Sequence, residues 1–243
     1  MTLHPPPLLR SHALFLDFDG TLVDLAATPG MVLVPAELLH LLEQVSARLD
    51  GAMAIVSGRS VDDLSRLLVG FPGVLVGQHG LERRRADGRI IRWSTDPGHA
   101  LIRRAVAEFA ARHEGVTIED KGATVAVHFR SAPWLESECK TLAGQLADAS
   151  GGALEAIDGK MVVELVPEGS GKGGAIAALH AEPPFVGRVP VFVGDDSADE
   201  EGFAVVHSLG GISVHVGDGA TSARYRFGSF RHVRDWLERA LAR

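Results

Sequence analysis

One stretch near the start of the chain, Ala13–Leu22, most constrains the fold. It reads ALFLDFDGTL: four apolar residues lead into Asp17, and a second carboxylate follows at Asp19. A short apolar run that ends in a glycine-containing turn predicts a strand buried on both faces, with the aspartates at its carboxyl end. Ligands of open α/β sheets bind at that edge. The two carboxylates repel each other unless they share a cation or a proton. The alternative with no catalytic role is an Asx turn, in which Asp19 forms hydrogen bonds only with the local backbone.

The segments after this strand alternate between strand and helix patterns. A helix starts near Pro35, a buried strand covers 52–56, and Ser60 with Asp63 forms a capping box that opens a second helix. A third strand is predicted over 74–80 (VLVGQHG). This β-α-β-α-β order predicts a parallel sheet with right-handed crossovers. The pattern resumes after Gly169 with a helix over 174–180, strands over 190–194 and 212–216, and a final helix carrying Val233, Trp236, Leu237 and Leu241.

The middle of the chain has a different pattern, αββαββ, which predicts a separate small domain. The helices are expected over 99–113 and around Leu135–Leu146, and the strands near 116–119, 123–129, 152–157 and 161–166. Alternation in these strands favours an antiparallel sheet with one open, polar face on which a ligand could lie. Cys139 belongs to an apolar helical stripe, which makes it structural.

Composition excludes several classes of function. The net charge of -7 argues against a nucleic-acid partner, and a single cysteine excludes an intrachain disulfide or a cysteine-based zinc site. We find no apolar stretch long enough to span a membrane and no signal-peptide pattern, so we expect a cytoplasmic protein. We also expect a monomer whose partner is a small molecule. Residues 1–10, with Pro5-Pro6-Pro7, are expected to be flexible.

A second acidic stretch, Gly194–Glu201 (GDDSADEE), also follows a buried strand. Its Asp195, together with Asp17 and the backbone carbonyl of Asp19, could form a site built only of oxygen ligands. Such a site suits Mg²⁺. None of the 11 histidines has the spacing of a zinc ligand pair.

Two further segments have the character of phosphate-binding loops. Ser57-Gly58-Arg59 joins a strand end to a helix start, where backbone N–H groups and a hydroxyl can hold a phosphate. Taken alone, these residues are also explained by Ser57 as a simple strand-exit residue. Gly169–Gly174 (GSGKGG) fits G-x-G-x-x-G, with Asp195 about 20 residues further on, so a dinucleotide-binding fold is a real alternative. Pro167-Glu168 argues against that alternative. The same segment also does not match the sequence pattern of a Walker A loop. We prefer an interpretation in which Lys172 is a point charge on a phosphate and on Asp17.

These four pieces, in this order, resemble the haloacid dehalogenase (HAD) superfamily of phosphohydrolases. Finer motifs resemble its trehalose-6-phosphate phosphatase family: DFDGTL, SGR, GQHGLE (77–82), EDKGATVAVHFR (119–130), GKMVVELVP (159–167), GKGGAI (171–176) and GDDSADEEGF (194–203). The sequence departs from that family at Ala198, where threonine is usual, and at Val23-Asp24, where Pro-Ile is common.

The resemblance implies an α/β fold in two parts. A Rossmann-like parallel sheet forms the core domain over 11–95 and 168–243, and the inserted αββαββ block over 96–167 forms an α+β cap. The cap would select the substrate, and the core would carry the chemistry.

The resemblance also implies roles for individual residues in phosphate monoester hydrolysis. Asp17 is the nucleophile, and Asp19 is the general acid and base. The remaining assignments are phosphate binding by Ser57, Gly58 and Lys172; Mg²⁺ binding by Asp17, Asp19 and Asp195; support of that site by Asp196 and Asp199; and sugar binding by Glu119, Lys121 and Glu164, with Arg59, His79, Arg130 and Lys160 as weaker candidates.

Three rival functions stay open. One is a HAD phosphatase for a different sugar phosphate, such as a sucrose, mannosylglycerate or glucosylglycerate phosphate. Another is a switch protein phosphorylated on aspartate, in which Asp19 and the cap would be redundant. The third is a nicotinamide-dependent oxidoreductase based on the glycine-rich segment.

Overall fold

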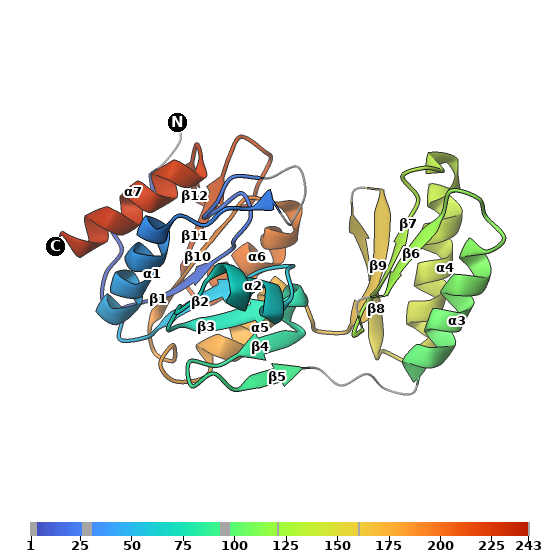
Figure 1. The fold of residues 1–243 in the computed structure, drawn as a ribbon, viewed down its shortest axis with the longest axis horizontal. Coiled ribbons are helices and arrows are strands. Elements are labelled where there is room, and N and C mark those ends of the chain that lie inside the picture. The colour runs from blue at the N-terminus through green and yellow to red at the C-terminus, as the bar shows by residue number, and fades with distance from the viewer. Residues whose placement is uncertain (1–3, 26–30, 93–97, 121, 160, 243) are drawn as a thin grey trace. The chain divides into compact units, whose positions relative to one another are not determined.

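The computed structural model describes residues 4–25, 31–92, 98–120, 122–159 and 161–242. The chain divides into two compact units, which Figure 1 shows. Residues 1–92 and 171–243 form the first unit, and residues 93–170 form the second. The first unit holds a mostly parallel sheet, and the second holds an antiparallel one.

The first unit is built on an eight-stranded sheet of order β12-β11-β10-β1-β2-β3-β4-β5. All neighbouring strands from β12 to β3 are parallel, whereas β4 and β5 run antiparallel to their neighbours. The strands are β1 (His12–Leu16), β2 (Met53–Val56), β3 (Val74–Gly77), β4 (Glu82–Arg84), β5 (Ile90–Arg92), β10 (Val189–Gly194), β11 (Ile212–Val216) and β12 (Tyr225–Phe227). The five residues of β1 and the four of β2 are all buried, because helices cover both faces of a parallel sheet.

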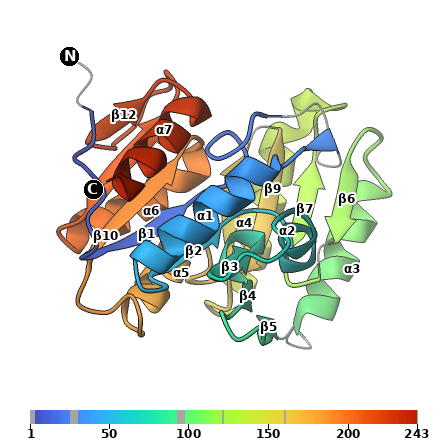
Figure 2. The same ribbon diagram turned by 60° about the vertical axis from the view of Figure 1, so that its left-hand side comes forward.

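Helices cover this sheet on both sides (Figure 2). On one face lie α1 (Ala36–Arg48), α2 (Val61–Leu67) and α7 (Phe230–Leu241), and on the other lie α5 (Lys172–His180) and α6 (Glu200–Ser208). The contacts between α1 and α7 and between α5 and α6 close the two layers. This arrangement confirms the predicted α/β class with a Rossmann-like core.

Strand register explains why distant motifs meet. Leu16 of β1 is aligned with Val193 of β10 on one side and with Ile55 of β2 on the other. Asp17 follows Leu16 directly, and both Asp195 and Ser57 come two residues after the partners of Leu16. Strands β2 and β10 flank β1 on opposite sides, so the strand order reverses at β1. Ligands of such folds bind at the point of reversal.

Several elements of the first unit were missed or misplaced in the sequence prediction. The third strand ends at Gly77 rather than Gly80, and a 3-10 turn, η2 (Gln78–Gly80), follows it. Helix α6 begins inside the acidic stretch Gly194–Glu201, for which no helix is predicted. Strands β4, β5 and β12 are three residues long and mostly unburied, so they carry no buried apolar run.

The N-terminal segment is seated on the core rather than flexible from residue 4 onward. Leu8 is buried in the hydrophobic core, and Trp236 of α7 donates a hydrogen bond of 2.9 Å from Nε1 to the Pro6 carbonyl. The expectation of a flexible lead-in is therefore corrected for residues 4–10. Proline residues remove donors, but they leave a carbonyl that an indole N–H can reach.

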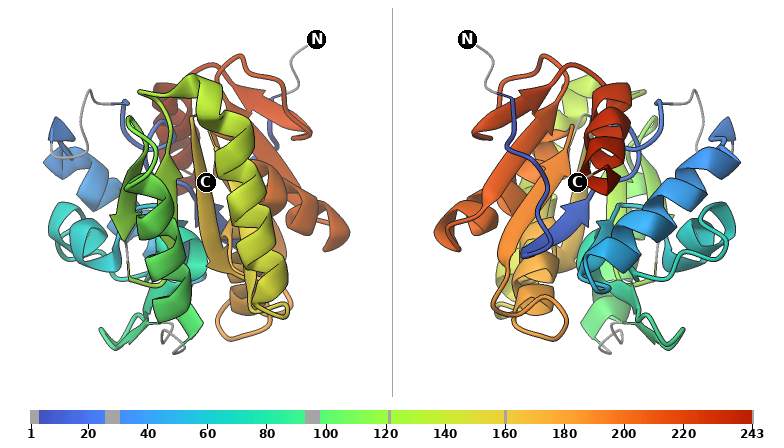
Figure 3. Two further views of the ribbon diagram at one scale, coloured as in Figure 1. Left: turned by 90° about the vertical axis from the view of Figure 1, so that its right-hand side faces the viewer. Right: turned by 90° about the vertical axis from the view of Figure 1, so that its left-hand side faces the viewer.

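The second unit has the predicted αββαββ order. Its sheet runs β6-β7-β9-β8, antiparallel throughout. The elements are α3 (Gly98–Ala110), β6 (Thr117–Asp120), β7 (Val125–His128), the 3-10 turn η3 (Pro133–Leu135), α4 (Glu136–Ala149), β8 (Leu154–Gly159) and β9 (Val162–Pro167). Helices α3 and α4 lie side by side along one face of this sheet (Figure 3).

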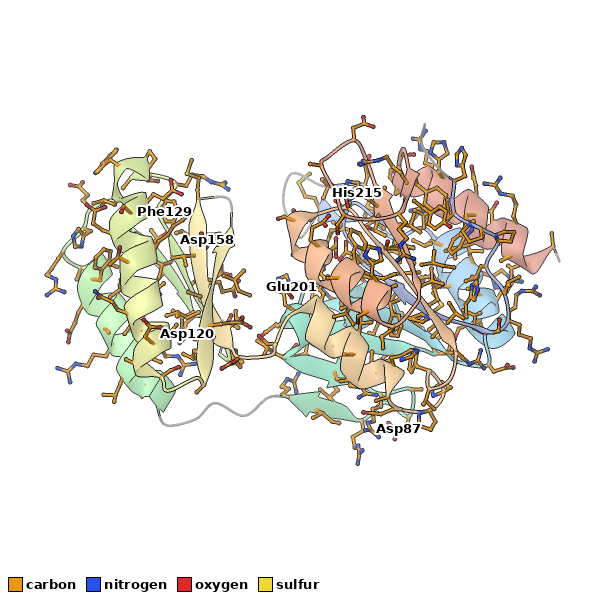
Figure 4. The ribbon with its side chains drawn as sticks, turned by 180° about the vertical axis from the view of Figure 1, so that it is seen from behind. Asp87, Asp120, Phe129, Asp158, Glu201 and His215 are labelled. Atoms are coloured by element: carbon orange, nitrogen blue, oxygen red, sulfur yellow. The ribbon has the colours of Figure 1, made fainter. Side chains whose placement is uncertain are left out.

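A small apolar core joins those two helices to the sheet. It contains Val127 and Leu165 from the strands, Val106 from α3, and Phe129, which Figure 4 labels. Cys139 of α4 is buried in the same cluster, as expected for a structural cysteine. Among the residues of this unit that the structure describes, no helix lies on the opposite face of the sheet.

The glycine-rich segment Gly169–Gly174 does not have the setting that a dinucleotide fold requires. It follows β9, which pairs antiparallel with β7 and β8 in the second unit. It then enters α5, which belongs to the first unit. A dinucleotide fingerprint instead joins a strand and a helix of one parallel sheet.

Candidate active site

The loop after β1 carries the first pair of acids and closes on itself. The Asp17 N–H donates to the Val193 carbonyl at 2.9 Å, which fixes the start of the loop on β10. The Leu22 N–H then returns to the Phe18 carbonyl at 2.9 Å. Gly20 has a φ of +80°, and a Cβ there would lie 2.0 Å from Asp195 Oδ2. Only glycine therefore lets this loop approach the acidic loop so closely.

Lys172 joins the two loops electrostatically. Its Nζ lies 2.6 Å from Asp17 Oδ1 and 2.6 Å from Asp199 Oδ1, and the three side chains are at most 5% exposed. Burial favours the neutral amine, but the two carboxylates outweigh it and raise the pKa of Lys172 above its usual range. Lys172 is therefore a fixed positive charge at the base of the site.

The start of α5 aims Lys172 into this position. Gly171, the residue before the helix, has a φ of +106°, and a Cβ there would lie 2.3 Å from Glu201 Oε2. Glu201 is in the first turn of α6, where Figure 4 labels it. A larger residue at Gly171 would be strained at this φ and would displace the Glu201 carboxylate.

Asp199 organises the acidic loop from inside. Its Oδ2 accepts hydrogen bonds from the N–H groups of Asp195 and Asp196, both at 2.9 Å, and its Oδ1 accepts from Lys172. Asp196 is exposed, and it caps the 3-10 turn η4 (Ser197–Asp199) through the Ser197 N–H at 2.5 Å. Both oxygens of Asp199 are thus occupied, and they hold Asp195 toward Asp17.

The resulting cluster is suited to a divalent cation. One oxygen from each of Asp17, Asp195 and Asp199 lies within 4.8 Å of the others. Burial raises the pKa values of Asp17 and Asp195, and one ammonium faces three carboxylates. A cation would remove this excess negative charge. The donors are carboxylate oxygens, which suit Mg²⁺, and Asp17 and Asp195 could hold it because Asp199 is engaged elsewhere.

The Ser57-Gly58-Arg59 turn is linked to the Lys172 loop through η2. The Gln78 N–H donates to the Arg59 carbonyl at 2.8 Å, and the His79 N–H donates to the Ser57 carbonyl at 3.1 Å. The His79 carbonyl then accepts from the Gly171 N–H at 2.6 Å. His79 has a left-handed φ of 54°, which is strained for a non-glycine residue. It therefore acts through its backbone as a bridge between two predicted phosphate loops.

Arg59 binds Asp19, the second acid of the loop after β1. Its Nε and Nη2 donate to the two oxygens of Asp19 at 2.6 and 2.8 Å, and its Nη1 donates to Asp63 at 2.6 Å. The guanidinium also lies over the Phe18 ring, 5.6 Å from the centroid. The predicted role of Arg59 is sugar binding, whereas the structure pairs it with Asp19, the predicted general acid.

The open sheet face of the second unit carries the other predicted residues. Register aligns Glu119 of β6 with Ala126 of β7, and Ala126 with Glu164 of β9, so the two glutamates flank one alanine in a single row. Glu164 Oε1 accepts from the Thr124 hydroxyl at 2.5 Å, and Glu119 Oε2 lies 3.1 Å from His128 Nε2.

His128 was not among the predicted site residues. The strand alternation, which places it two residues beyond Ala126, predicts it on the same polar face but assigns it no role. Of the remaining candidates, Arg130 is exposed just after β7, whereas Lys121 and Lys160 lie outside the described residues.

Comparison with known proteins identifies the family. A family model described as trehalose-phosphatase matches residues 15–229. The chain belongs to the trehalose-phosphatase family. It is 42% identical over 235 residues to the trehalose-6-phosphate phosphatase of Escherichia coli (strain K12), a match that covers 96% of this chain and 88% of that protein.

Comparison with solved structures shows that this member of the trehalose-phosphatase family has the HAD fold. It matches an Aspergillus fumigatus trehalose-6-phosphate phosphatase with a TM-score of 0.78 and 22% identity, covering 98% of both chains. It also matches a HAD superfamily phosphatase from Bacteroides thetaiotaomicron with a TM-score of 0.65 and 17% identity, covering 93% and 94%. These structures confirm the predicted HAD fold, and the family match with the 42% identical relative confirms the assignment as a phosphatase. No helix in the described part of the chain has the length and apolar character needed to cross a membrane.

Proposed function

We propose that this member of the trehalose-phosphatase family hydrolyses trehalose 6-phosphate to trehalose and inorganic phosphate. One observation carries the proposal: a buried Lys172 bridges Asp17 and Asp199 at 2.6 Å each, at the carboxyl edge of a parallel sheet. A phosphate oxygen bound there would meet a fixed positive charge beside a carboxylate nucleophile. The choice of trehalose as the sugar of the substrate rests on membership of the trehalose-phosphatase family.

Asp17 is the proposed nucleophile. Its free carboxylate oxygen would attack phosphorus in line, forming an aspartyl-phosphate as the bond between phosphorus and the sugar oxygen breaks. Water would then cleave the acyl phosphate and regenerate Asp17. Lys172, together with Ser57 and the Gly58 N–H, would stabilise the charge that develops on the phosphoryl oxygens.

Asp19 is the proposed general acid and base. It would give a proton to the departing sugar oxygen and then take one from the attacking water. Its contact with Arg59 holds the carboxylate in a defined place between these steps. The same contact must loosen when Asp19 is protonated, since a neutral acid no longer pairs with a guanidinium.

Mg²⁺ is the proposed cofactor, and Asp17, Asp195 and the backbone carbonyl of Asp19 are its proposed ligands. When bound, it would supply positive charge for the transferring phosphoryl group. Asp199 would keep Asp195 in place through the two backbone hydrogen bonds that it accepts.

The open face of the second unit is the proposed sugar-binding surface. Glu119 and Glu164 can each accept hydrogen bonds from hydroxyl groups, and the strand register places them on either side of Ala126. His128, which contacts Glu119, adds a further polar group to this face. Lys121, Arg130 and Lys160 remain proposed contributors, as do Arg59 and His79 of the first unit.

A substrate panel tests the proposal. Phosphate release should be measured with trehalose 6-phosphate, sucrose, mannosylglycerate and glucosylglycerate phosphates, and glucose 6-phosphate, each with and without Mg²⁺. We expect the largest kcat/KM for trehalose 6-phosphate, and none above background for Asp17→Asn. A higher kcat/KM for any other sugar phosphate would transfer the proposal to that substrate.

A further inference from the structure

One arginine of the C-terminal helix reaches the loop that carries Asp17 and Asp19. Arg234 of α7 donates two hydrogen bonds to the Leu22 carbonyl, from Nε at 2.9 Å and from Nη2 at 2.7 Å. The two residues are 212 positions apart in sequence. A charged donor that makes two bonds to one oxygen is stronger than a neutral backbone contact.

The Leu22 carbonyl is part of the same closed turn as Asp19. Leu22 and Val23 both donate to the Phe18 carbonyl, at 2.9 and 3.2 Å, and Gly20 donates to the Val23 carbonyl at 2.9 Å. Asp19 and Val23 also form an isolated β-bridge. Residues 18–23 therefore move as one piece, and whatever holds Leu22 also sets where Asp19 lies.

Seating α7 does not require Arg234. The helix already buries Val233, Trp236, Leu237 and Ala240 against the core. Arg234 is partly buried, its guanidinium lies 5.0 Å from the centroid of the Phe230 ring, and burial lowers its pKa. No carboxylate among the described residues forms an ion pair with it. Partial desolvation of an arginine that contacts a backbone carbonyl and an aromatic ring but no carboxylate is costly, which points to a specific role for its contact with Leu22.

We propose that Arg234 is a positioning residue, which fixes the loop 18–23 so that Asp19 can protonate the departing sugar oxygen. Asp19 is then held from two sides, by Arg59 at its carboxylate and by Arg234 through its loop. The inference rests on the proposed roles of Asp17 and Asp19. It adds a residue of α7 that touches neither the substrate nor the reacting atoms.

The leaving group distinguishes this role from a merely structural one. A sugar alkoxide is a poor leaving group and needs the proton of Asp19, whereas p-nitrophenolate leaves without one. Because kcat/KM reports only the steps through the first irreversible phosphoryl transfer, it isolates the acid step. We expect Arg234→Met to lower kcat/KM for trehalose 6-phosphate by about 10- to 100-fold, within what general acid catalysis contributes. With p-nitrophenyl phosphate we expect a change of less than about threefold.

A double-mutant cycle provides the second measurement. In an Asp19→Asn background, Arg234→Met should change kcat/KM for trehalose 6-phosphate by less than about threefold, since the group that it positions is already gone. Additive losses would overturn the proposal, as would equal losses with the two substrates in the single variant. Arg239→Met is the matched control, because Arg239 is an exposed arginine of α7 whose Nε bonds only to the Asp235 carbonyl of its own helix.

Two further points keep the result interpretable. Activity toward p-nitrophenyl phosphate shows that each variant is folded, and Arg234→Lys, which keeps a donor and a charge, should recover part of the lost sugar phosphate activity. The wild-type rate with trehalose 6-phosphate tests the proposed function separately. If the wild type prefers another sugar phosphate, the same ratio is measured with that substrate.

Discussion

Arg59 and Asp19 form a two-pronged ion pair, with Nε to Oδ2 at 2.6 Å and Nη2 to Oδ1 at 2.8 Å. The Arg59 side chain is only 9% exposed, and the hydrogen bond to Asp19 is the largest contribution that raises its pKa above the usual range. A planar guanidinium matches both carboxylate oxygens at once. The pair therefore sets the direction of the Asp19 carboxylate in the structure without substrate.

Replacing Arg59 tests whether catalysis requires the two-pronged ion pair with Asp19. We expect Arg59→Lys to lower kcat with trehalose 6-phosphate by at least about tenfold, because one ammonium cannot hold both oxygens of Asp19. The comparison variant is Arg66→Lys, since Arg66 is an exposed partner of the same Asp63. Unchanged kcat for Arg59→Lys would show that Asp19 does not depend on this ion pair during turnover.

Removing the proposed nucleophile should lower activity far more than it lowers the free energy of unfolding. Asp17→Asn should lower kcat by at least about 10³-fold, as removal of a reacting group does in other enzymes. Its unfolding free energy should fall by no more than about 1 kcal/mol, because Lys172 keeps its bond to Asp199 and one of three crowded negative charges is gone. Denaturant unfolding and phosphate release measured on one preparation check both parts. More than a tenth of wild-type activity would remove Asp17 from its proposed role.

Metal removal is expected to abolish activity. The clustered oxygens of Asp17, Asp195 and Asp199 predict inhibition by EDTA and recovery with Mg²⁺. Binding should also be visible without turnover, since Mg²⁺ should raise the thermal midpoint of the wild type and raise that of Asp195→Asn less. Full activity in EDTA, or recovery with Zn²⁺ alone, would contradict an oxygen-only magnesium site.

Sugar selection should depend on the second unit. Hydrogen bonds to a charged group contribute about 1.5–3 kcal/mol, so Glu164→Ala should lower kcat/KM for trehalose 6-phosphate by roughly 10- to 200-fold. Hydrolysis of p-nitrophenyl phosphate should change little, because that substrate has no sugar. Glu138→Ala serves as control, since Glu138 is exposed on α4. If both substrates lose activity together, Glu164 supports the structure of the second unit instead.

Burial of His12 should contribute a loss of stability as pH falls. The His12 side chain is 5% exposed, its Nδ1 accepts from the Leu9 N–H at 3.2 Å, and burial lowers its pKa. The unfolded chain thus binds a proton more readily, so stability is retained above about pH 6.5 and lost below it, by at most about 1.4 kcal/mol per pH unit for this residue.

His12→Asn isolates this contribution, because the Asn amide oxygen can still accept from the backbone but does not titrate. We expect a shallower decline of unfolding free energy between pH 7.5 and about pH 5.5 than in the wild type. Residual decline in the variant is expected from His207 and His215, whose pKa values burial also lowers. Parallel curves for wild type and variant would exclude His12 as a contributor.

Much of the fold and the core of the site could be predicted from local sequence. Apolar runs that end in Asp17, Ser57 and Asp195 indicated buried parallel strands, and parallel strands bring their carboxyl ends to one edge. Alternation in the middle segment indicated an antiparallel sheet with one polar face, on which Glu119 and Glu164 lie in one row. These features follow from periodicity, which depends only on neighbours in the chain.

Contacts between segments far apart in sequence were decided only by the tertiary structure. Periodicity gave no sign that Arg59 pairs with Asp19, that the His79 backbone links two loops, or that Arg234 holds Leu22. The short strands β4, β5 and β12 were also missed, because neighbouring strands rather than buried apolar runs define them. Arginine reaches its partner through a long, flexible side chain, so its sequence position does not fix what it touches. The strands thus follow from the sequence pattern, whereas the groups that orient Asp19 depend on how the packed strands and helices bring distant residues together.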